Sequence, residues 1–170
     1  GTGELLVTEK KYEVNGEKRL YFSELYLECH APLSQKSKLD IVTRAVEQVN
    51  RKYYGDDDAA RKMEIKNVIY RELEEEGAIK VESLREKVFP DSPEMQTAFD
   101  EKMEKYNLPY ETVQPKNEQT VKKFQSQRLT TDTGIEITIP MEEYQNPDRV
   151  EFITNPDGTI SVLIKNIGHL

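Results

Sequence analysis

Residues 155–165 read NPDGTISVLIK, and this stretch decides the fold of the C-terminal part of the chain. Pro156 fixes its own φ and Gly158 accepts a positive φ, so the first four residues are typical of a tight turn. Apolar residues then recur at every second position from Ile160 to Ile164, as expected for a strand with one apolar face. The stretch therefore predicts an antiparallel β-structure near the C-terminus.

Two earlier segments belong to the same predicted β-structure. Isoleucines alternate with polar residues over residues 135–139, and residues 150–153 supply a further apolar segment before the turn. The alternation favours strands that bury one face. We therefore predict a compact C-terminal antiparallel β-meander of at least three strands over residues 129–166.

The middle region of the chain predicts helices, because its apolar residues recur at helical spacing in four successive segments. Gly55 and Gly77 are predicted to end the first and second helices. Ser92 is predicted to cap the fourth. Ser37 with Asp40 has the spacing of a capping box for the first helix.

The N-terminal region predicts a β-hairpin over residues 5–29, because two β-rich segments flank Asn15-Gly16, a dipeptide that favours type I′ turns. The fold class is thus α+β, with an N-terminal β-hairpin, a four-helix middle region and a C-terminal antiparallel β-meander.

The predicted domain organisation follows these elements. Residues 1–107 hold the hairpin and the helical region, and residues 121–170 hold the C-terminal β-unit, which packs on the rest. Residues 108–120 contain two prolines and no apolar period, which favours a linker or a long loop. Because the chain starts Gly-Thr-Gly without Met and strand-like sequence follows at once, we expect a fragment of a longer protein.

Composition narrows the function classes. The chain has 170 residues, a formal net charge of -8 and a single cysteine, Cys29. A single cysteine excludes an intramolecular disulfide and favours a reducing compartment. No apolar run approaches the roughly 20 residues of a spanning helix, so no membrane partner is expected. The negative charge repels phosphate overall, so any nucleic-acid contact must be local or indirect.

The C-terminal strings identify a family. TGIEITIP at 133–140, VEFI at 150–153 and NPDGTISVLIKNI at 155–167 resemble the end of the bacterial 37-kDa nucleoid-associated protein family, and residues 21–46 resemble it more weakly. The resemblance implies a cytoplasmic protein at the bacterial nucleoid and a C-terminal fragment of a longer family member. It implies a non-enzymatic binding or assembly module whose partners are nucleoid DNA, nucleoid proteins or both, and it supplies no catalytic residue.

Two groups of cations are candidates for neutralising DNA phosphates without reading bases. Because charged side chains are mostly exposed in any protein, a solvated surface is the simpler interpretation. A helix-turn-helix over residues 64–106 is disfavoured, because its second helix would present acids to phosphate. The first group of candidates is Lys116, Lys122, Lys123 and Arg128, and the second is Lys36, Lys38 and Arg44.

Two alternative functions remain open. The apolar faces of the predicted strands must be buried against another surface. The chain can therefore be a protein-interaction module without a nucleic-acid role, or it can form a homo-oligomer. A metal-dependent nucleic-acid hydrolase is the least favoured, because the runs at 56–58 and 74–76 are typical of helix-end and surface acids. Cys29 and His30 are adjacent and point to opposite faces of a strand, so they do not form a catalytic pair. We expect no catalytic residue, no metal and no cofactor.

Overall fold

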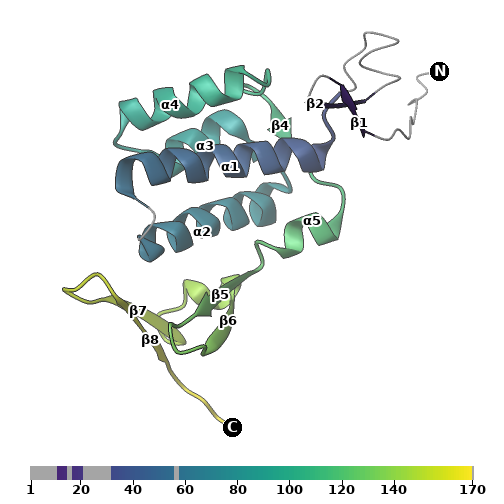
Figure 1. Cartoon of the computed structure of the whole chain (residues 1–170). Helices are drawn as coiled ribbons and strands as arrows, with labels where there is room; N and C mark the ends of the chain where they lie inside the picture. Colours follow the sequence, from purple (N-terminus) through teal and green to yellow (C-terminus); the bar gives the residue numbers. More distant parts are fainter. Residues whose placement is uncertain (1–10, 15–16, 21–31, 56–57, 170) are drawn as a thin grey trace. The chain divides into compact units, whose positions relative to one another are not determined.

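The computed structural model describes residues 11–14, 17–20, 32–55 and 58–169 (Figure 1). The chain divides into two compact units, residues 1–34 and residues 35–170. In the first unit, β1 (Lys11–Val14) and β2 (Glu17–Leu20) pair antiparallel with Val14 opposite Glu17. The other residues of the predicted hairpin lie outside the described residues.

Four helices in the second unit surround an apolar core. Helix α1 packs against α4, and α2 packs against α3. Their apolar stripes meet in one cluster, in which Leu39 of α1 and Phe99 of α4 are fully buried. The bounds are α1 (Gln35–Tyr54), α2 (Ala59–Glu76), α3 (Val81–Val88) and α4 (Pro93–Glu104).

The ends of these helices follow from local chemistry. Gly77 ends α2 in the left-handed region at φ 64°, and its N–H donates to the Leu73 carbonyl. Ser92 caps α4 through its hydroxyl, which accepts the Met95 N–H, and Pro93 is the first helical residue. The predicted capping box at Ser37 is wrong: α1 begins at Gln35, so Ser37 lies inside the first turn.

A short sheet that periodicity did not indicate closes the helical core. Strand β3 (Ile79–Lys80) pairs antiparallel with β4 (Thr112–Val113), which lies in the proline-containing segment 108–120. Leu108 and Val113 of that segment are buried in the core cluster. Strands of two residues are too short to show an alternating pattern. Whether the segment also separates two domains stays a prediction.

The C-terminal part consists of two hairpins and two short helices. Residues 155–158 form the predicted turn: the Gly158 N–H donates to the Asn155 carbonyl at 2.9 Å, and Gly158 has φ 84°. Strand β5 pairs with β6 and β7 pairs with β8, both antiparallel. The bounds are α5 (Glu118–Lys122), β5 (Ser126–Thr130), β6 (Glu136–Pro140), α6 (Met141–Tyr144), β7 (Val150–Thr154) and β8 (Ile160–Ile164).

The continuous meander predicted over residues 129–166 is wrong. Strand β6 pairs only with β5 in the described part of the chain, and β7 pairs only with β8. Helix α6 follows β6 directly, and the turn in which the Arg149 N–H donates to the Asn146 carbonyl precedes β7. These two features turn the chain between the hairpins, so the two isoleucine rows belong to separate sheets.

The described residues confirm the α+β class. They contain six helices and four two-stranded antiparallel sheets. Among the helices so described, none combines the length and the apolar character that crossing a bilayer requires.

Candidate functional site

The Asp40 carboxylate on α1 lies near two cations of the same helix and forms an ion pair with a lysine that is distant in the sequence. The Lys123 Nζ, just after α5, donates to the Asp40 Oδ1 at 2.7 Å. This hydrogen bond is the main reason that the pKa of Asp40 is lowered, and the charges of Lys36 and Arg44 lower it further. Lys36 and Arg44 lie one helical turn before and after Asp40 on α1, and Lys123 forms an ion pair with it, so this site is locally positive on a chain of net charge -8. We call Lys36, Arg44 and Lys123 the Asp40 cluster.

The Asp40 cluster therefore joins members of both predicted groups of phosphate-contacting residues. Lys36 and Arg44 lie on the exposed face of α1, and Lys123 comes from the other group. The sequence separates Asp40 from Lys123 by 83 residues, so spacing alone did not indicate that the two groups meet.

Of the remaining predicted phosphate-contacting residues, two form ion pairs with acidic side chains of the described residues and two do not. Lys38 Nζ lies 2.8 Å from Glu111 Oε2, and Arg128 donates to Glu136 at 2.6 Å. An acid at hydrogen-bond distance offsets each of these positive charges. Lys116 and Lys122 are exposed, and neither has an ion pair with another described residue. The structure thus brings Lys36, Arg44 and Lys123 together at Asp40. The other four candidates, Lys38, Lys116, Lys122 and Arg128, are not part of this group.

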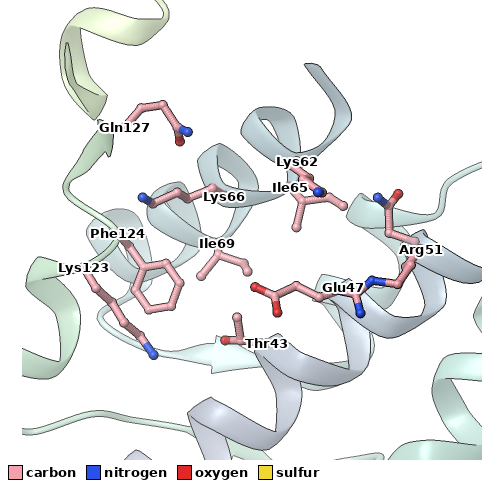
Figure 2. Close-up of a pocket in the computed structure, with 11 residues that line it drawn as sticks. Thr43, Glu47, Arg51, Lys62, Ile65, Lys66, Ile69, Lys123, Phe124 and Gln127 are labelled. Atoms are coloured by element: carbon pink, nitrogen blue, oxygen red, sulfur yellow. The ribbon is translucent and has the colours of Figure 1, made fainter. Parts of the chain in front are cut away.

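A cavity of about 480 Å³ opens beside the cluster, between α1, α2 and the start of β5. Figure 2 shows Ile65 and Ile69 of α2 facing Thr43 and Glu47 of α1, with Phe124 on a third side. The apolar side chains form part of the wall and polar groups complete it. The lining residues are Thr43, Glu47, Asn50, Arg51, Lys62, Ile65, Lys66, Ile69, Lys123, Phe124 and Gln127.

Three polar groups of this cavity lack partners in the described part of the chain. Burial lowers the pKa of Lys66, and no described residue forms a hydrogen bond or ion pair with it. The side-chain oxygens of Asn50 and Gln127 are buried and accept no hydrogen bond from the described residues. Buried polar atoms are usually satisfied, so the two unsatisfied amide oxygens in one cavity need an explanation.

Sequence reasoning missed Lys66 and the cavity. A lysine on an amphipathic helix resembles any solvated surface lysine. The only sequence feature that could have indicated the cavity is the pair of polar residues Lys66 and Asn67 among apolar residues. Such a pair also occurs on an ordinary helix surface, so it does not predict a cavity. The cavity depends on how three elements approach, and periodicity carries no such information.

The candidates for metal chemistry find no support in the described residues. No group of three or more His, Cys, Asp or Glu side chains is arranged to hold a metal there. Asp58 caps α2 by accepting the Arg61 N–H, as a helix-end acid would, and residues 74–76 are exposed in its last turn. Asp56, Asp57, Cys29 and His30 lie outside the described residues.

The helix-turn-helix alternative also lacks the chemistry that it needs. Glu94, Glu101 and Glu104 of α4 are exposed, and Asp100 forms an ion pair with Arg85 at 2.7 Å. A recognition helix would have to bring these acids towards phosphate, which like charge opposes.

The fold and these sites define a small α+β protein with a locally basic surface and an adjoining cavity lined by apolar and polar side chains. The comparisons then identify its family. The family model described as nucleoid-associated protein YejK (NA37) matches residues 4–169, which is nearly the whole chain. The chain belongs to this family, and the predicted relationship is confirmed. Neither the curated proteins nor the solved structures gave a significant match.

Proposed function

We propose that this chain is a non-enzymatic binding module of the bacterial nucleoid, and that it contacts DNA phosphates through the Asp40 cluster. Membership of a family described as nucleoid-associated supports the nucleoid role. The single observation that carries the DNA contact is the convergence of Lys36, Arg44 and Lys123 on one carboxylate. On this proposal, the protein acts at the nucleoid within the bacterial cytoplasm.

The chemistry of the cluster fits phosphate rather than bases. Lys36 and Arg44 are exposed on α1, so their charged ends can reach the phosphate oxygens of a strand that passes over the helix. The ion pair with Asp40 fixes the position of Lys123 and reduces its availability. Lys and Arg that neutralise phosphates give binding that is independent of sequence and weakens as salt rises. Lys116 and Lys122 are proposed as peripheral contributors, because each is exposed near α5.

Charge reversal of the cluster tests this function. We expect the double variant K36E/R44E to bind a fluorescein-labelled DNA duplex about tenfold more weakly or worse at low salt, measured by fluorescence anisotropy, because two phosphate contacts are lost. The matched control is R71E/K80E, which makes the same change in net charge at an exposed arginine of α2 and an exposed lysine of β3. Equal loss in both double variants would show that only the overall charge matters, and would overturn the site.

A second candidate function is self-assembly, and the β7–β8 hairpin favours it. Ile153 and Leu163 on one face are 44% and 47% exposed, and Ile164 on the other face is 45% exposed. Isolated two-stranded sheets are marginal in water, and open strand edges pair readily with other strands. A second copy of this chain offers the same hairpin, so it can pair with the first about a two-fold axis.

Sedimentation velocity over a range of protein concentrations tests this candidate. We expect a dimer that the double variant I153K/L163K shifts towards monomer, because two charges on the same apolar face oppose association. The control I135K alters an isoleucine of the other hairpin that is 59% exposed and outside β6. A monomer at every concentration would discard self-assembly through this hairpin.

A further inference from the structure

The cavity between α1, α2 and β5, which both apolar and polar side chains line, has features that the DNA contact does not use. Its volume of about 480 Å³ lies within the range of ligand pockets, roughly 300–1,000 Å³. An internal core space would be apolar, whereas this one has charged and amide side chains around an apolar floor. Asn50 is the clearest case, because its side chain is 2% exposed and its Oδ1 has no partner among the described residues.

The unsatisfied groups specify complementary chemistry. The Lys66 ammonium group is partly desolvated and unpaired, so a ligand with a negative charge would restore what burial removes. The Asn50 and Gln127 oxygens need donors, and Glu47 on α1 offers a further acceptor at the wall. The ligand should therefore carry an anionic group together with N–H or O–H groups.

Shape and placement narrow the ligand further. Figure 2 shows Lys66 and Gln127 on one side of the cavity and Glu47 on the other. An anionic group at the Lys66 side would stay away from the Glu47 carboxylate. Ile65, Ile69 and Phe124 supply an apolar wall, against which a flat ring can lie.

We propose that this cavity binds a nucleotide unit, with its phosphate at Lys66 and its base and sugar donors at Asn50 and Glu47. The unit has the phosphate, the flat ring and the donor groups that the lining residues need. It can come from a free nucleotide or from the end of a nucleic-acid strand, because both present the same chemistry. The proposal does not depend on the Asp40 cluster, with which the cavity shares only Lys123.

Isothermal titration calorimetry of the 170-residue chain tests the proposal. The probes are the four 5′-ribonucleoside monophosphates, the matching nucleosides, inorganic phosphate and a short 5′-phosphorylated single strand. We expect at least one monophosphate to bind about tenfold more tightly than its nucleoside, because a hydrogen bond to a charged group is lost without the phosphate. A strand that binds more tightly than the free monophosphates would assign the strand end as the source, and the reverse order would assign the free nucleotide.

Substitution of Lys66 locates the site. We expect K66M, which keeps the length of the side chain and removes its charge, to weaken binding of that monophosphate about tenfold. K105M is the matched control, because Lys105 is an exposed lysine on a separate cavity and should leave binding unchanged. The free energy of unfolding of K66M, measured in urea, should equal that of the unmodified chain or exceed it. The substitution removes a partly buried charge that has no ion-pair partner among the described residues.

Three results would overturn the proposal: no heat with any phosphate-bearing probe, equal affinity of nucleoside and monophosphate, or unchanged affinity in K66M. The outcome is separable from that of the proposed function. K36E/R44E should bind duplex DNA more weakly and keep monophosphate binding, because neither residue lines the cavity.

Discussion

Replacement of Phe99 by alanine should lower the free energy of unfolding by about 3–5 kcal/mol, the range found when a buried phenylalanine is truncated. Phe99 is fully buried in the core cluster. Its ring lies 6.1 Å from that of Phe89, centroid to centroid, and α4 packs on α1. The truncation therefore removes contacts that join α4 to the rest of the helical core and leaves a cavity.

Urea denaturation followed by circular dichroism measures this loss. The control is E101A on the same helix, because Glu101 is exposed and alanine is a better helix former. We expect E101A to match the unmodified chain within about 0.5 kcal/mol. A loss below about 1 kcal/mol in F99A would contradict the packing of α4 on α1, since truncation of a buried phenylalanine to alanine costs about 3–5 kcal/mol.

Removal of the Lys87 charge should be the second most damaging change. Glu72 is buried, with 3% of its surface exposed, and its carboxylate forms an ion pair with the Lys87 ammonium group. In K87M the buried Glu72 carboxylate loses its ion-pair partner. The Lys87 side chain is half exposed, so its replacement by Met removes few packing contacts. We expect a loss of about 2–3 kcal/mol, less than for a fully buried pair because solvent reaches the lysine end.

A double-mutant cycle tests the origin of that loss. E72Q removes the buried charge and should cost about 1 kcal/mol or less. The double variant E72Q/K87M should be more stable than K87M alone, because the isolated carboxylate is then absent. If K87M is as stable as the unmodified chain, Glu72 has another way to reach water and the pair does not contribute.

The sequence predicted the features that depend on neighbours along the chain. Gly77 ends a helix because a positive φ is needed there, and Ser92 with Pro93 starts one, so each signal lies within a few residues of the element that it sets. The turn at 155–158 is of the same kind. Family membership also followed from the strings around this turn, and the match over residues 4–169 confirms it.

Features that depend on tertiary packing were not predictable in this way. The rows ending at Ile139 and Ile164 have the same alternation, so they do not reveal that they belong to different sheets. Val113 lies in a proline-containing segment with no period, and yet it is fully buried. Lys66 looked like any helix-surface lysine. In each case the deciding contact comes from a segment far away in the sequence.

The candidate site was predicted in part. All three members of the Asp40 cluster were among the candidates. They were chosen because lysine and arginine side chains can neutralise phosphate. Their convergence was not predicted, since it depends on the contact between Asp40 and Lys123. Whether the seven candidates touch DNA is a prediction, and the ion pairs of Lys38 and Arg128 make those two the weakest.

The most direct test of the central claim is the salt dependence of duplex DNA binding by this chain. We predict measurable binding at low salt, with the logarithm of the affinity falling linearly with the logarithm of the salt concentration. The slope for K36E/R44E should be shallower by about 2, roughly one unit for each phosphate contact removed. No binding at the lowest salt, or the same slope in both proteins, would contradict direct DNA contact through the Asp40 cluster.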